Sequence, residues 1–258
     1  NATKDVTYVN VSNCNASTGY EVVDFGGRDL GGNMNWQFFP PVVPGMTNAW
    51  TGAASSDPGN SANWSQSRCP VPTDAILVKA DAVNAMEITA AATTYNSLTV
   101  EEGARLTLNG DLLTVTNFLN VAGTLECKGA RKLVVGGDLT FASPASLVSG
   151  DGQVVLSGGA TKTVDAHGAR FCTLELDATC GDVAFASDVK AERIRSRAGS
   201  AMRTIETSAG ATIEADGLLL DGWIDEETKG LTLKSATDGA VWKLKAKYFA
   251  TVRGASVR

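Results

Sequence analysis

The chain has 258 residues, of which 43% are apolar and 19% are charged, with a net charge of −6. This composition excludes a disordered tail, which would hold more charge and fewer aliphatic residues. The acidic balance argues against nucleic-acid binding, because a phosphate-binding surface needs clustered Lys and Arg. No segment approaches the roughly 20 uninterrupted apolar residues of a membrane span, so no span is expected.

The first part of the chain is irregular. We interpret residues 1–39 as a closing β segment of a repeat unit and residues 40–75 as a Trp- and Pro-containing connector or cap. Strands are predicted over Thr7–Asn13 and Tyr20–Phe25. The run Pro40-Pro41-Val42-Val43-Pro44 favours extended backbone, because proline disfavours helix at its own position and at the one before it.

Residues 76–258 alternate apolar and polar side chains with a period of two, which predicts short β-strands. Gly, Asn, Asp or Ser bounds each of them, as expected for strands between turns. The stretch from Asp188 to Arg197 fits either a helix or a strand. The clearest strand candidates are 98–100, 106–108, 113–115, 119–121, 133–135, 154–156, 174–176 and 231–233.

Turn phrases recur along this region. Gly103-Ala104-Arg105-Leu106 resembles Gly210-Ala211-Thr212-Ile213, and a degenerate copy starts at Gly123, 20 residues after Gly103. A spacing of that size is typical of one turn of a β-solenoid, in which neighbouring coils bury each other's apolar faces. The sequence therefore predicts an all-β solenoid over residues 76–258, with a β-sandwich of similar strands as the alternative.

The two ends of the chain resemble each other. Thr7-Tyr8-Val9-Asn10-Val11-Ser12 aligns with Thr251-Val252-Arg253-Gly254-Ala255-Ser256 at an offset of 244 residues. The chain also begins without an initiator Met or a signal peptide. We therefore expect a unit of about this length to repeat in a longer protein, of which this chain is one copy.

The order Trp50-Thr51-Gly52, Asn63-Trp64-Ser65, Pro72-Thr73-Asp74, followed by Gly-Ala-x-Leu and Gly-Thr-Leu phrases, resembles large repetitive bacterial cell-surface proteins. Those proteins are right-handed parallel β-helices, such as adhesins and autotransporter passenger regions. The resemblance implies a right-handed parallel β-helix, a secreted or cell-surface location, and a structural or adhesive role. It implies no catalytic residues.

Three tryptophans, Trp36, Trp50 and Trp64, are spaced 14 residues apart in the irregular segment. Indole faces stack on pyranose rings, so these residues are candidates for binding a glycan. The alternative is that they plug a junction between modules and cover an open solenoid end.

Catalysis is not expected. Asp165 and His167 would share one side of an extended strand, so a hydrogen-bonded pair is possible, but a turn residue beside a surface imidazole is the favoured interpretation. Asp138, Asp151, Asp165 and Asp182 fall on successive predicted coils and could form a catalytic row, yet most lie beside Gly, as in ordinary turns. A β-helical carbohydrate-active enzyme (a polysaccharide lyase or a glycoside hydrolase) remains the alternative function.

Five scattered cysteines do not define a disulfide framework, and Cys172 with Cys180 is the best candidate pair. Buried free thiols are the alternative. No cofactor is expected, although calcium is possible at the acidic turns 149–152 and 216–222, since extracellular calcium sites use oxygen ligands. The expected partners are neighbouring repeat modules, further copies of the chain, or surface and matrix glycans.

Overall fold

The structure is a computed structural model that describes residues 3–43, 45–197, 199, 201–223 and 230–257. The chain divides into two compact units, residues 1–46 and 47–258. In the described part, no α-helix occurs, and two 3₁₀ turns interrupt the strands, η1 (Ser61–Asn63) and η2 (Pro144–Ser146). No helix of this part is long and apolar enough to cross a membrane.

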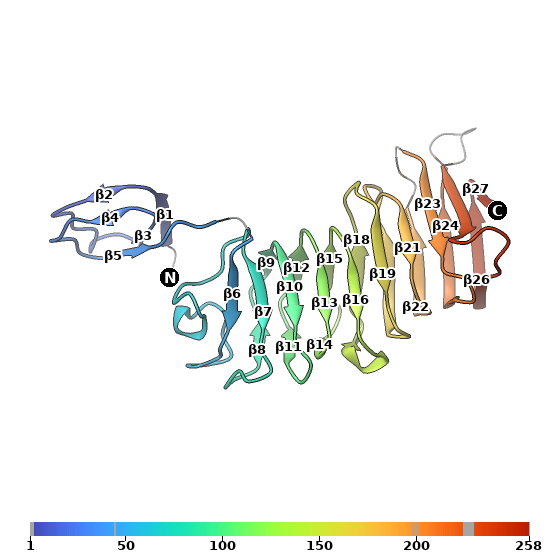
Figure 1. Cartoon of the computed structure of the whole chain (residues 1–258), viewed down its shortest axis with the longest axis horizontal. Helices are drawn as coiled ribbons and strands as arrows, with labels where there is room; N and C mark the ends of the chain where they lie inside the picture. Colours follow the sequence, from blue (N-terminus) through green and yellow to red (C-terminus); the bar gives the residue numbers. More distant parts are fainter. Residues whose placement is uncertain (1–2, 44, 198, 200, 224–229, 258) are drawn as a thin grey trace. The chain divides into compact units, whose positions relative to one another are not determined.

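The second unit is a parallel β-solenoid whose coils follow one another from β6 to β27 (Figure 1). One sheet of ten strands runs along its whole length, and every pairing within this sheet is parallel. Its strands are β6 (Thr47–Trp50), β7 (Ala75–Val78), β10 (Ser97–Val100), β13 (Leu119–Val121), β16 (Leu139–Phe141), β19 (Lys162–Asp165), β21 (Val183–Phe185), β23 (Arg203–Thr207), β25 (Leu231–Ser235) and β27 (Ala255–Val257).

Two further sheets complete the coils. The eight-stranded sheet holds β9 (Ala92–Tyr95), β12 (Leu112–Val115), β15 (Lys132–Val135), β18 (Gln153–Leu156), β20 (Arg170–Leu176), β22 (Val189–Ser196), β24 (Thr212–Asp221) and β26 (Lys243–Arg253). The four-stranded sheet holds β8 (Met86–Ile88), β11 (Arg105–Leu108), β14 (Thr124–Cys127) and β17 (Leu147–Val148). Coils therefore have three strands from β7 to β18 and two from β19 to β26, where the strands of the eight-stranded sheet lengthen.

The predicted solenoid is confirmed. The β-sandwich is excluded because each strand pairs in parallel with the corresponding strand of the next coil. On the ten-stranded sheet, residues in register lie 20 to 28 positions apart along the chain. The stretch from Asp188 to Arg197 is the strand β22 and not a helix. The strand predicted over Thr7–Asn13 is wrong as one element, because Tyr8 takes a φ of 57° and turns the chain.

The core is a set of apolar columns that run through the coils. One column has side chains that are at most 2% exposed, because each is covered by its counterparts in the coils before and after it. Leu106 and Leu113 hold the same kind of inward position on the other two sheets. The members of the first column are Ile76, Leu98, Leu119, Leu139, Val164 and Phe185.

The recurring turn phrases mark the coil corners. Gly103 and Gly210 take φ values of 81° and 78°, a conformation that side chains with a Cβ rarely adopt, and each precedes a strand. Gly110, Gly137 and Gly181 have ordinary φ values, but a Cβ on any of them would collide with a backbone carbonyl of the preceding coil. Glycine is required there by close packing between coils.

The first unit is a smaller set of parallel strands. β1 (Thr3–Thr7), β3 (Glu21–Phe25) and β5 (Trp36–Phe39) form one sheet, and β2 (Asn10–Val11) and β4 (Arg28–Asp29) form a second. A single positive-φ residue, Tyr8 or Gly26, opens the corner between the two sheets. The described residues 3–39 thus repeat the strand–corner–strand order of the solenoid coils.

Candidate functional site

The start of the solenoid is closed by two buried tryptophans. Trp50 lies on β6 with 0% of its surface exposed, and Trp64 follows η1 with 3% exposed. Their rings meet edge to face at 5.1 Å. Each indole N–H donates to a carbonyl, Trp50 to Asn84 (2.8 Å) and Trp64 to Pro58 (2.9 Å). Their faces cannot stack on a sugar, so they plug the end of the core.

Asn63 holds the loop that carries these tryptophans. Its side chain is fully buried, and its Oδ1 accepts from the backbone N–H groups of Ala54 and Ser55. Its Nδ2 donates to Ser55 Oγ and to the Asp57 carbonyl, at 2.9 and 2.8 Å. This one amide therefore organises a loop that has little apolar surface of its own.

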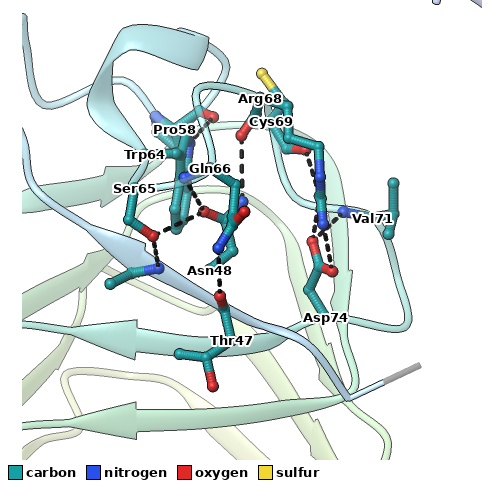
Figure 2. A network of polar contacts seen from close by, with 11 residues as sticks. Thr47, Asn48, Pro58, Trp64, Ser65, Gln66, Arg68, Cys69, Val71 and Asp74 are labelled. Carbon is teal, nitrogen blue, oxygen red and sulfur yellow. Dashed lines mark hydrogen bonds and ion pairs between the residues drawn. The ribbon is translucent and has the colours of Figure 1, made fainter. Parts of the chain in front are cut away.

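An ion pair completes the closure (Figure 2). Arg68 Nη1 donates to Asp74 Oδ2 at 2.5 Å, and Nη2 donates to Oδ1 at 2.8 Å, with the side chains 4% and 0% exposed. Asp74 Oδ2 also accepts from the Val71 N–H, and Asn48 Nδ2 donates to the Arg68 carbonyl. Both charges are satisfied inside the protein, so this network supports structure and offers no open site. Asn63 and Asp74 stand in the phrases Asn63-Trp64-Ser65 and Pro72-Thr73-Asp74 of the sequence, but no motif singled out Arg68.

Trp36 differs from the other two tryptophans because it is only partly buried. It lies on β5 of the first unit, and its ring stacks on Phe38 at 5.9 Å between centroids. Its Nε1 has no hydrogen-bond partner within the described part of the chain. Of the three glycan-binding candidates, Trp36 alone keeps an indole that is partly open to solvent.

Asp165 and His167 do lie together. His167 Nδ1 is 3.2 Å from Asp165 Oδ1 and 2.8 Å from the Phe141 carbonyl. The carbonyl can only accept, so the neutral ring carries its proton on Nδ1 and donates it there. The imidazole is 49% exposed, and His167 takes a φ of 44° at a coil corner. The hydrogen bond to Phe141 therefore ties this corner to the preceding coil, whereas Asp165 Oδ1 has no hydrogen-bond partner among the described residues.

The row of aspartates does not gather at one place. Asp138 Oδ1 accepts from the Thr163 N–H and Asp182 Oδ1 from the Thr204 N–H, both at 2.7 Å. In each case the N–H belongs to the next coil. Asp151 is an exposed turn residue. The Asp138 and Asp182 carboxylates thus cap backbone groups between coils.

Two buried basic side chains also donate hydrogen bonds to backbone carbonyls. Lys162, 1% exposed, donates from Nζ to the carbonyls of Gly158 and Ala160 at 2.8 and 2.7 Å. Arg203 donates to the carbonyls of Cys180 and Asp177, and burial lowers its pKa. Sequence reasoning missed both, because a buried Lys or Arg looks like any surface residue in a strand.

The cysteines are free thiols. Cys172 lies on β20 with its Sγ 3.6 Å from Glu192, whereas Cys180 is buried in the following turn against the core. The disulfide suggested by the sequence is not formed, because the two thiols have different neighbours. In the described ranges no cluster of three His, Cys, Asp or Glu side chains is placed to hold a metal, and calcium at the acidic turns stays a prediction.

At the other end of the described coils, β26 has an exposed face. β26 is the last strand of its sheet, and all of its residues except Thr251 are exposed. A hollow of about 330 Å³ lies beside it, with an apolar lining. Its walls are formed by Leu233, Ala240, Val241, Trp242, Leu244 and Val257.

Fold and surface together define a parallel β-solenoid whose first coil is plugged by two tryptophans and whose strand β26 is exposed in the described residues. The chain matches no known family model, no curated protein sequence and no solved structure.

Proposed function

We propose that this chain is a structural module of a long, repetitive, secreted or cell-surface protein. The observation that carries the proposal is that many of its charged side chains form ion pairs between coils. Arg105 and Glu126 pair between adjacent coils at 2.5 Å, as do Arg197 and Glu175 at 2.6 Å. Further inter-coil pairs are Arg131–Asp111, Lys234–Glu206 and Lys128–Glu87.

Four of these pairs join adjacent coils, and the Lys128–Glu87 pair reaches across one intervening coil. An enzyme would instead direct its acids and bases toward one substrate cleft. The carboxylates of Asp138 and Asp182 are committed to backbone N–H groups, which supports a scaffold over a β-helical lyase or hydrolase. The surface location is supported by the resemblance to repetitive bacterial surface proteins.

The location is tested by labelling intact cells of the source organism with an antibody raised against this chain. We expect labelling without permeabilisation, and we expect external protease to remove it. Labelling only after permeabilisation would contradict the proposal. Catalysis is tested separately by reducing-sugar and unsaturated-product assays on a polysaccharide panel. Turnover that is lost in both Asp165→Asn and His167→Ala would establish the enzymatic alternative.

Glycan binding by the first unit is a second candidate, which the partly open stack of Trp36 on Phe38 favours. A sugar ring would cover the exposed indole face and alter its fluorescence. We expect oligosaccharide titration to change the emission of the wild type and not of Trp36→Ala, with Trp36→Phe retaining part of the affinity. Equal binding by the wild type and Trp36→Ala would exclude this site.

A further inference from the structure

We propose that the outer side of the eight-stranded sheet, over β22, β24 and β26, binds an acidic polysaccharide. The binding residues are Arg193 and Arg195 on β22 and Lys247 and Phe249 on β26, which together form the basic face. The partner is a chain of pyranose rings that carries carboxylate groups. This binding surface goes beyond the structural role proposed above.

The arginines of β22 point away from the core. Ala191 and Ile194 are 1% and 3% exposed and face inward. Because side chains alternate along a strand, Arg193 and Arg195, on either side of Ile194, face outward. Arg193 is exposed although β20 and β24 pair with β22 on its two sides. This side of the sheet is therefore open to solvent within the stack of coils.

Both arginines are available to bind an anion. The two residues that flank Arg193 in register, on β20 and β24, carry no charge. Arg195 lies beside Glu175 in register, but the Glu175 carboxylate accepts from Arg197 at 2.6 Å. Neither arginine forms an ion pair within the described part of the chain. An unpaired guanidinium presents a planar set of donors that matches the two oxygens of a carboxylate.

Phe249 supplies an aromatic ring next to these charges. It pairs in register with Gly217, whose other partner in register is Arg193. A Cβ built on Gly217 would lie 2.5 Å from Phe249 Cζ, so the ring reaches over β24 toward β22. The side chain of Phe249 is 56% exposed. Sugar rings stack on exposed aromatic faces, so this residue favours a polysaccharide over other polyanions.

A β-bulge brings Phe249 to this position. Between the register pairs made by Ala215 and Gly217, β26 holds one more residue than β24. Bulges re-aim neighbouring side chains and are common next to active sites. Here the bulge contains Lys247, whose Nζ lies 4.8 Å from the centre of the Tyr248 ring. The bulge therefore places a lysine beside two aromatic rings.

The charge on these strands is opposite in sign to that of the whole chain. β22, β24 and β26 carry seven Lys or Arg against four acidic residues, whereas the chain has a net charge of −6. One of the four acids, Asp216, already pairs with Arg170 at 2.9 Å. A local excess of positive charge on an acidic protein attracts a polyanion. The other three acids are Glu192, Glu214 and Asp221.

The spacing of the strands favours a polymer over a single sugar acid. The basic side chains lie on β22 and β26, which are two strands apart, or about 10 Å. A polysaccharide that crosses the coils would meet both rows, whereas one sugar acid would meet only one. The affinity should therefore rise with the length of the polysaccharide.

The test compares three polymers by isothermal titration calorimetry on the full chain. Carboxymethyl-dextran carries pyranose rings and carboxylates, dextran carries the rings alone, and polyglutamate carries the carboxylates alone. We expect carboxymethyl-dextran to bind most tightly, with an affinity that falls as the salt concentration rises. Absence of binding to carboxymethyl-dextran, or equal binding of dextran or polyglutamate at matched concentrations, would overturn the proposal.

Substitutions on the same sheet locate the surface. Replacing both arginines, by Arg193→Gln with Arg195→Gln, should lower the affinity for carboxymethyl-dextran about tenfold, because charge-assisted hydrogen bonds are lost. Lys132→Gln is the matched control and should bind like the wild type. Lys132 is exposed and lies in the same register column as Arg193, three strands earlier. Equal losses in the control and the double variant would refute the proposed surface.

The aromatic contribution is tested by Phe249→Leu, which keeps an apolar side chain and removes the ring. This variant should lose affinity for carboxymethyl-dextran and not for polyglutamate, and an unchanged affinity for both would refute the stacking role. Trp36→Ala should bind carboxymethyl-dextran like the wild type, whereas loss of binding there would place the site in the first unit and refute this proposal. Circular dichroism matching the wild type establishes that the variants fold.

Discussion

Arg68 and Asp74 are six residues apart and form a bidentate ion pair that is almost wholly buried. Asp74→Ala would leave the Arg68 charge in the protein interior. We expect a loss of about 3–5 kcal/mol in the free energy of unfolding, measured by urea titration. Trp50 and Trp64 lie at the same end of the core and give a local fluorescence readout.

Asp81→Ala is the matched control for this change. Asp81 is 73% exposed and pairs with Lys79 in solvent, so its removal should leave stability nearly unchanged. Equal effects of the two substitutions would show that the Arg68–Asp74 pair does not hold the first coil.

Adjacent residues Phe118 and Leu119 provide a direct test of the period-two alternation. Leu119 is 1% exposed in the core column, whereas Phe118 is 40% exposed. Leu119→Ala should cost about 2–5 kcal/mol, because it leaves a cavity between coils. Phe118→Ala removes the larger side chain and should change stability by only about 0.5 kcal/mol. A larger effect at Phe118 in thermal denaturation would contradict the register of β13.

Thr207 interrupts the same column, in register with Phe185 and Ser235. It is fully buried, and its Oγ1 finds no hydrogen-bond partner among the residues that the structure describes. Thr207→Val keeps the shape and removes the unpaired hydroxyl, so the free energy of unfolding should rise by about 1 kcal/mol. Thr207→Ser keeps the hydroxyl and loses the methyl group, and it should destabilise the protein. Destabilisation by valine would reveal a hidden partner for the hydroxyl.

Thiol chemistry reports on the core at Cys127. Burial raises the pKa of this thiol from 9.0 to about 11. Because the thiolate is the reactive form, iodoacetamide at about pH 8 should leave Cys127 unmodified in the folded protein and label it after denaturation. The exposed Cys69 serves as the internal control, and peptide mass spectrometry distinguishes the two.

The same shift links stability to pH. Between pH 9.0 and about 11 the unfolded chain loses the Cys127 proton while the folded chain keeps it. Because the folded state binds this proton more tightly, raising the pH through this window favours the unfolded state. The contribution of Cys127 to stability is therefore fully present below pH 9.0 and is lost as the pH rises to about 11. Cys127→Ala should show a different slope of stability against pH over the same range in urea titrations.

The strands of the solenoid could be predicted from the sequence because an inward position recurs at every second residue. The windows at 98–100 and 119–121 coincide with β10 and β13 almost residue for residue. The corners were visible as well, since Gly103 and Gly210 open strands in repeated phrases. Parallel stacking followed from the spacing of those phrases.

The candidate site was less accessible to sequence reasoning. Trp50 and Trp64 are buried and Trp36 is partly exposed because different parts of the chain cover their rings. The alternation of apolar and polar residues does not predict which part of the chain covers a given ring. The Arg68–Asp74 pair forms across an irregular loop without a repeat. Tyr8 shows the same difficulty, because a left-handed corner at a tyrosine has no compositional signal.

The exposed face of β26 also affects how the protein unfolds. Each coil is held only by its two neighbours, so a coil with a single neighbour opens at the lowest free energy. Hydrogen exchange should therefore be fastest at β26 and β27 and slow progressively toward β13. Unfolding of the described coils would therefore begin at β26 and β27, well away from the buried tryptophans of the first coil.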